Sequence, residues 1–178
     1  MKGTQWMAVA AAVLLLPAAA SASDDLTAEK AFERLKALAG TWEGSASGEG
    51  AEAAAEADAT GQVVHEFEVT ASGHVVMERM GPDTDYEMVN MYHLDGGDLV
   101  LTHYCSSGNQ PRMKFNAATS APNRLVFDFD GGTNLDTTPS HIHSAEIRLD
   151  GKDRLDSAWM VHEGDEEAGT MTFHLKRQ

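Results

Sequence analysis

From Gly61 to the C-terminus, short runs of β-prone residues alternate with turn residues, and no run has the length and period of a helix. Turns such as Asp95-Gly96-Gly97-Asp98 separate most of these runs. Parallel strands would need long crossovers, so strands that follow one another through turns are expected to pair antiparallel. The predicted strands are 61–70, 73–80, 86–94, 98–105, 111–117, 123–130, 141–149, 153–162 and 168–177.

A tenth strand is expected around Trp42, after the one segment that has a helical pattern. The helix is predicted over 26–39, with Thr27 as its N-cap, and Gly40 ends it. Ten consecutive strands close most simply into a barrel, which leaves no unpaired edge. The fold class expected is therefore all-β, an antiparallel up-and-down barrel of about ten strands with one short N-terminal helix.

The first 22 residues have the pattern of a secretory signal peptide: a positive Lys2, an apolar run, and a small-residue cleavage site at Ala20-Ser21-Ala22. We therefore expect an exported protein, periplasmic or secreted, whose residues 23–178 form a single domain. Its one cysteine, Cys105, allows no internal disulfide. The Ala/Glu-rich stretch 45–60 reads as a flexible loop.

The formal charge of −15 argues against nucleic acid and anionic lipid as partners, since a strongly acidic surface repels both. The expected partner is a small molecule, with no nucleic acid and no membrane insertion after signal cleavage. The sequence does not specify an oligomeric state.

Side chains alternate between the two faces of a strand, so apolar positions identify the inner face of the barrel. Inner faces are predicted at Leu125, Phe127 and Phe129, at Leu155, Trp159 and Val161, and at Met171, Phe173 and Leu175. The same rule turns His65, His103, Cys105, His141 and His143 inward, and His162 and His174 outward. His93 fits either face.

The stretch from Glu87 to Phe115 carries the densest polar chemistry of the chain. A barrel of eight to ten strands leaves room for one small ligand, and polar groups inside it would orient that ligand. We therefore predict an exported small-molecule-binding barrel that holds a partly apolar ligand in its interior. The predicted ligand-binding residues are Tyr92, His93, His103, Cys105, Asn109, Gln110, Arg112, His141 and His143.

Two alternatives stay open. Two imidazoles in His141-x-His143, with His103, would make a three-nitrogen site for zinc or another late transition metal in a metal-binding protein or a metal-dependent enzyme. The other alternative is a structural envelope protein with no ligand. His103 and Cys105 share a face, but no third group orients them for nucleophilic catalysis, so no catalytic residue is predicted.

The helix followed by Gly40-Thr41-Trp42 resembles the first-strand signature of the calycins, the lipocalin-like barrels. That resemblance implies a Trp that closes one barrel end under a basic residue of the last strand, and Arg177 has the matching parity. EMVNMYHLDGGDLVLTHYCSSGNQPRM, FDFDGG and HIH resemble a widespread family of uncharacterised exported bacterial proteins, which implies a lipocalin-like barrel and no activity. The strand count is similar to that of nitrobindin, a haem-binding barrel, but its haem-ligating histidine matches no residue here. His174 of the last strand has outward parity, so haem is not predicted.

Overall fold

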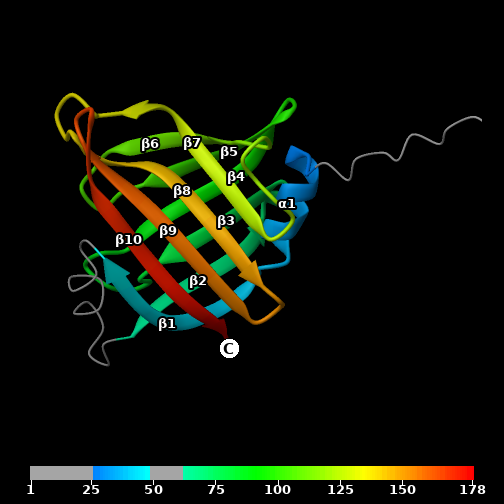
Figure 1. The fold of residues 1–178 in the computed structure, drawn as a ribbon. Coiled ribbons are helices and arrows are strands. Elements are labelled where there is room, and N and C mark those ends of the chain that lie inside the picture. The colour runs from blue at the N-terminus through cyan, green and yellow to red at the C-terminus, as the bar shows by residue number, and fades with distance from the viewer. Residues whose placement is uncertain (1–25, 49–61) are drawn as a thin grey trace, which may run out of the picture.

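A computed structural model describes residues 26–48 and 62–178 and shows a closed antiparallel barrel of ten strands (Figure 1). Each strand pairs with its neighbours in the sequence, and β1 and β10 pair with each other to complete the ring. The fold predicted from the turns and strands is therefore confirmed. The strands are β1 (Gly40–Gly48), β2 (Val63–Thr70), β3 (Val75–Met80), β4 (Met88–Asp95), β5 (Asp98–Tyr104), β6 (Gln110–Phe115), β7 (Arg124–Thr133), β8 (Ser140–Asp150), β9 (Arg154–Glu163) and β10 (Glu166–Arg177).

The single α-helix of the described residues, α1 (Ala28–Lys36), covers one end of the barrel and contacts β4 and β5 (Figure 1). The Thr27 hydroxyl accepts a hydrogen bond from the Lys30 amide at 3.3 Å, as its position before the helix predicts. Phe32 and Leu35 are buried on the inner side of the helix. The helix thus supplies the apolar lid for this end of the interior.

The predicted pairing of Arg177 with Trp42 is confirmed. The guanidinium lies 4.3 Å from the centroid of the indole ring, which is 1% exposed. Arg177 also donates to the carbonyls of Ala37 and Ala39 at 2.8 Å, and the indole donates to the Leu38 carbonyl at 2.7 Å. These contacts join the end of the chain to the end of the helix and satisfy its free carbonyls.

Most of the predicted inner faces are buried, including Leu125, Phe127, Leu155, Trp159 and Phe173. The pairing register shifts at three places: between Pro111 and Met113 of β6, between Glu167 and Gly169 of β10, and between Ile142 and Ser144 of β8. A bulge of this kind adds one residue to a strand and changes which residues share a face. The shift in β8 lies inside the predicted His141-x-His143 motif.

The predicted signal peptide, residues 1–22, lies outside the described residues, as do residues 49–60 of the predicted Ala/Glu-rich loop. Within the described segments, no helix is long and apolar enough to cross a lipid bilayer.

Candidate functional site

Five polar side chains inside the barrel are connected through one carboxylate, and we call them the Glu78 network. Glu78 on β3 accepts hydrogen bonds from Tyr92 at 2.6 Å and from Asn90 at 2.8 Å, and its Oε1 lies 2.8 Å from Nδ1 of His65. The Asn90 carbonyl in turn contacts Nδ1 of His103 at 2.7 Å. None of the five is more than 1% exposed. They meet because inward positions on β2, β3, β4 and β5 lie side by side in the register.

The hydrogen bonds of the Glu78 network determine the proton position on His103. Because the Asn90 amide donates to Glu78, its oxygen faces His103, so Nδ1 of His103 must carry the proton. Nε2 of His103 is then an acceptor, and it is buried without a partner among the described residues. Burial lowers the pKa of His103 to about 4 and raises the pKa of Tyr92. Both side chains are therefore neutral at pH 7.

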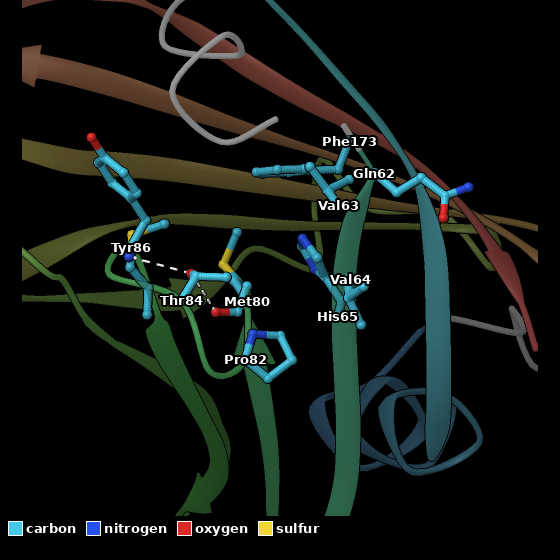
Figure 2. A pocket seen from close by; sticks show the side chains of 11 residues that line it. Gln62, Val63, Val64, His65, Met80, Pro82, Thr84, Tyr86 and Phe173 are labelled. Atoms are coloured by element: carbon cyan, nitrogen blue, oxygen red, sulfur yellow. Dashed lines mark hydrogen bonds between the residues drawn. The ribbon is translucent and has the colours of Figure 1, made fainter. Parts of the chain in front are cut away.

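A small pocket opens at the barrel end opposite α1, and we call it the rim pocket (Figure 2). Its wall is mainly apolar and is built by Val63, Met80, Pro82, Met88 and Phe173 around the ring of His65. The His65 ring also makes an edge contact with Phe173, with 4.6 Å between the ring centroids. His65 thus belongs to both structures: Nδ1 faces Glu78, and the rest of the ring lines the pocket.

The volume of the rim pocket limits what it can hold. The cavity measures about 50 Å³. That is more than the ~10–15 Å³ that one water needs, and less than the ~150 Å³ of a closed apolar cavity that takes up benzene. The pocket is therefore suited to one end of a molecule, with the remainder at its open mouth.

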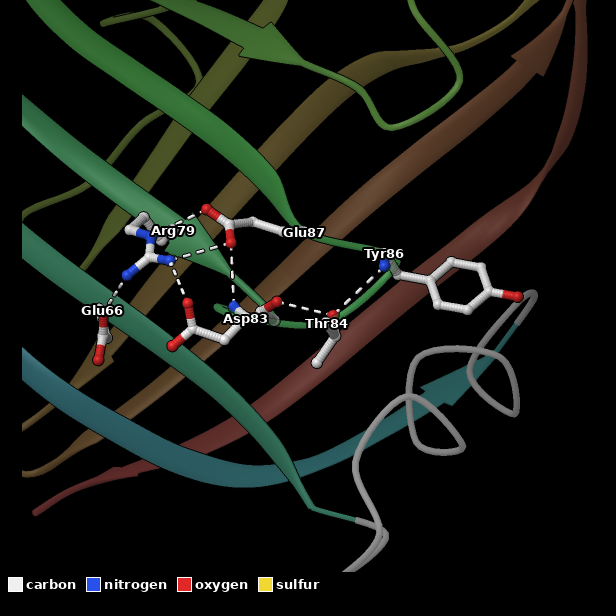
Figure 3. A network of polar contacts seen from close by, with 7 residues as sticks. Glu66, Arg79, Asp83, Thr84, Tyr86 and Glu87 are labelled. Atoms are coloured by element: carbon white, nitrogen blue, oxygen red, sulfur yellow. Dashed lines mark hydrogen bonds and ion pairs between the residues drawn. The ribbon is translucent and has the colours of Figure 1, made fainter.

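The loop between β3 and β4 forms one side of the rim pocket, and Arg79 holds it in place (Figure 3). The guanidinium binds both carboxylate oxygens of Glu87 at 2.9 Å, Glu66 at 3.0 Å and Asp83 at 3.2 Å. These bonds, with one from the Asp83 amide, hold the pKa of Glu87 below its usual value. The clamp connects β2, β3 and the start of β4 across the outer surface.

None of the nine predicted ligand-binding residues lines the rim pocket. Tyr92 and His103 lie in the Glu78 network, and His93 is half-buried on β4. Because Asn90 and Tyr92 point inward, the alternation of the strand assigns His93 to the outer face.

Four predicted ligand-binding residues lie in the turn between β5 and β6 or at the start of β6, and neighbouring residues hold them: Cys105, Asn109, Gln110 and Arg112. Asn109 donates to the carbonyls of Thr138 and Ser140, and Arg112 pairs with Asp130 at 2.8 Å. Gln110 donates to the Gly108 carbonyl, and the Ser107 hydroxyl contacts the sulfur of Cys105 at 3.0 Å. Gln110 and Arg112 also line an open groove with Tyr104, which is 47% exposed.

His141 and His143 form a stack with Phe129 and His162 at the ends of β7, β8 and β9. Nε2 of His141 contacts Nδ1 of His143 at 3.2 Å, and the rings of His143 and His162 lie parallel, 3.7 Å apart. Burial and the two neighbouring histidines lower the pKa of His143. His162, which was predicted to point outward, joins this stack because the bulge after Ile142 pairs it with His141.

This arrangement lends no support to the predicted metal ligands His103, His141 and His143. Over residues 26–48 and 62–178, no group of three or more His, Cys, Asp or Glu side chains is placed to hold a metal ion. His103 makes its ring contact with Trp159 and not with the stack. The parallel rings of His143 and His162 direct their in-plane lone pairs side by side, so the pairs do not converge on one ion.

Sequence reasoning missed Glu78 and Asn90, the two residues that connect the network. A signal for Glu78 was present: it lies between Val76 and Met80 at the inward parity of β3. A carboxylate at a core position needs buried donors, so parity alone could have marked it. The loop residues Pro82, Thr84 and Tyr86 had no such signal, because a loop has no alternation to read.

In comparisons with known proteins, no family model matches this chain, and no curated protein matches it either.

Proposed function

We propose that this protein binds a small, partly apolar molecule in the rim pocket and the barrel interior next to it. The observation that carries the proposal is the rim pocket itself: apolar side chains surround the edge of a buried imidazole whose orientation Glu78 fixes. Binding sites for small molecules are typically concave and apolar, with a few well-placed polar groups. The predicted export signal supports a role outside the cytoplasm.

The pocket wall offers natural reporters for a binding experiment. Met80 and Met88 line the pocket, whereas Met113 is buried on β6 away from it. Protein with ¹³C-labelled methionine methyl groups would be titrated with phenol, a small probe that is apolar with one hydroxyl. We expect the Met80 and Met88 signals to shift and saturate while the Met113 signal stays in place.

Two substitutions on β4 make a matched test. Met88→Trp adds bulk at the pocket, whereas Met91→Trp adds the same bulk three residues along, at a half-buried position that does not line the pocket. We expect Met88→Trp to abolish the phenol-induced shift of Met80 and Met91→Trp to retain it. Equal behaviour of the two variants, or shifts spread over all methionines, would refute a binding pocket here and favour a structural protein with a filled core.

A further inference from the structure

We propose that the rim pocket recognises its ligand through a neutral hydrogen-bond donor, an O–H or N–H group, which Nε2 of His65 accepts. This inference rests on the proposed function and specifies the ligand class for the same pocket. It predicts that alcohols, phenols or other neutral donors bind, and that molecules of the same shape with only acceptors are rejected.

The first step concerns the proton on His65. Glu78 accepts two hydrogen bonds on Oε2, from Asn90 and Tyr92, and its Oε1 lies 2.8 Å from Nδ1 of His65. A carboxylate oxygen cannot donate in this arrangement, so Nδ1 carries the proton that the bond needs. In the neutral form of the ring, the lone pair is then on Nε2. A carboxylate behind an imidazole commonly fixes the tautomer in this way.

The second step concerns the free nitrogen. Among the described residues, Nε2 of His65 has no hydrogen-bond partner, although the side chain is only 1% exposed. Figure 2 shows the ring beside Met80, with Phe173 and Val63 across the pocket. Because no described residue forms a hydrogen bond with Nε2, a second proton on the ring would also lack a protein partner there. The pocket therefore presents an imidazole nitrogen without a protein partner in a mainly apolar wall, to which Gln62, Thr84 and Tyr86 add polar groups.

The third step is selectivity. A ligand O–H directed at Nε2 satisfies the acceptor, whereas a methyl group leaves it buried and unpaired, and a carbonyl places two lone pairs face to face. Sites that hydrogen-bond a particular group discriminate strongly against analogues without it. The apolar wall offers no counter-charge to a charged ligand, which favours neutral donors.

Phenol and toluene test this directly, because they have nearly the same shape and differ in the donor. Titrations followed by the Met80 and Met88 methyl signals should show phenol binding about tenfold more tightly than toluene. Long-range ¹H–¹⁵N spectra should show His65 protonated at Nδ1 in the free protein, and a shift of its Nε2 resonance when phenol binds.

Glu78→Gln is the sharper variant, because it should invert the selectivity. The amide oxygen would stay with the two donors on Oε2, Tyr92 and Asn90, which leaves the amide nitrogen facing Nδ1 of His65. That nitrogen donates, so the imidazole proton must move to Nε2. The pocket would then prefer benzaldehyde, an acceptor, over phenol by about tenfold. Glu68→Gln, an exposed position on β2, makes the same charge change and should leave the preference unchanged.

The outcomes separate the two proposals. If neither phenol nor toluene shifts Met80 and Met88, the binding function fails and this inference with it. If phenol and toluene bind with equal affinity, or if the free protein carries a proton on Nε2 of His65, the proposal of a binding pocket survives. The proposal that His65 recognises a hydrogen-bond donor is then wrong. If Glu78→Gln does not fold, the comparison of phenol with toluene in the native protein still decides the question.

Discussion

At the scale of single residues, the buried His103 makes the stability of the folded protein depend on pH. Its ring is fully buried, one nitrogen is bonded to Asn90, and the other has no partner among the described residues. A charge on this ring would have to be placed in an apolar interior beside Trp159. The folded protein therefore resists protonation of His103, and the unfolded chain does not.

This difference predicts a pH dependence of the free energy of unfolding. Burial lowers the pKa of His103 to about 4, from an ordinary value of 6.5. As the pH falls below 6.5, the unfolded chain takes up a proton that the folded state refuses, so stability decreases until about pH 4. The full contribution is about 3 kcal/mol, from ~1.4 kcal/mol for each pKa unit. Urea unfolding at pH 7, 6, 5 and 4 would measure it.

The control for this measurement is a pair of histidine variants. His103→Gln removes the titrating ring and keeps an amide that can donate to Asn90, so its stability should fall less between pH 7 and pH 4 than that of the native protein. His74→Gln, at an exposed position, should retain the native slope. Parallel pH profiles for native protein and His103→Gln would contradict the assignment.

The alternation of side chains predicted which of these residues point into the barrel. It did not predict which of them contact one another. His65 and His103 were predicted to point inward and do so, because β2 and β5 are regular and carry apolar neighbours at the same parity. Their joint partner Glu78 was not predicted, since parity gives a direction and not a contact. The contact of His162 with His141 was not predicted, because a bulge in β8 changes which residue of that strand pairs with His162.

At the scale of elements, the loop between β3 and β4 depends on one side chain outside the barrel. Arg79 is the common partner of Glu66, Asp83 and Glu87, and the Asp83 amide donates to Glu87 at 3.0 Å (Figure 3). A guanidinium can make all these bonds at once because its donors form a planar fork, and an ammonium cannot. The pocket wall is thus held by a contact that faces away from the pocket.

We expect Arg79→Met to loosen this loop. The amides of Asp83 and Glu87 should exchange their hydrogens with solvent faster, because three carboxylates lose their common partner and repel one another. Phenol binding should weaken as well. Hydrogen exchange followed by NMR or mass spectrometry would measure the first effect, and the methionine titration the second.

Arg148→Met is the matched control, because Arg148 pairs with Glu146 on β8 and makes the same change in charge away from the loop. Arg148→Met should not change the hydrogen-exchange rates of the loop amides or the affinity for phenol. Unchanged exchange at Asp83 in Arg79→Met would show that backbone bonds, such as that from the Gly81 amide to the Val64 carbonyl, hold the loop without the clamp.

At the scale of the whole molecule, the ten-strand barrel could be predicted because order along the chain is also order in space. Every strand except the first and last pairs only with its sequence neighbours, so turns and alternation contain nearly all of the topology. Among the ten described strands, the one long-range pairing is that of β1 with β10, and it follows from closing the ring. The packing of side chains in the interior could not be predicted from the sequence, and this packing determines the volume of the pocket.

Closure makes the β1–β10 pairing the point where the whole fold is most sensitive to a single added atom. Gly44 pairs with Leu175, and a Cβ at this glycine would lie 1.8 Å from the carbonyl oxygen of His174 and 2.8 Å from its carbonyl carbon. Both atoms are backbone, so the two strands would have to separate to admit it. We therefore expect Gly44→Ala to destabilise the protein by about 2 kcal/mol or more, at the upper end of the usual cost of overpacking.

Gly97→Ala is the control, because it tests whether a Gly-to-Ala change destabilises the protein at any position or only where the strands close the barrel. Gly97 lies in the turn between β4 and β5, a Cβ there would meet nothing within 4 Å, and its φ is not positive. This variant should stay within about 0.5 kcal/mol of the native protein in urea unfolding. Because Trp42 lies in β1 and pairs with Arg177, its fluorescence reports directly on the closing strands. If Gly44→Ala is as stable as Gly97→Ala, β1 and β10 can separate at this point without loss of stability. Tight pairing of these two strands would then not be what stabilises the barrel.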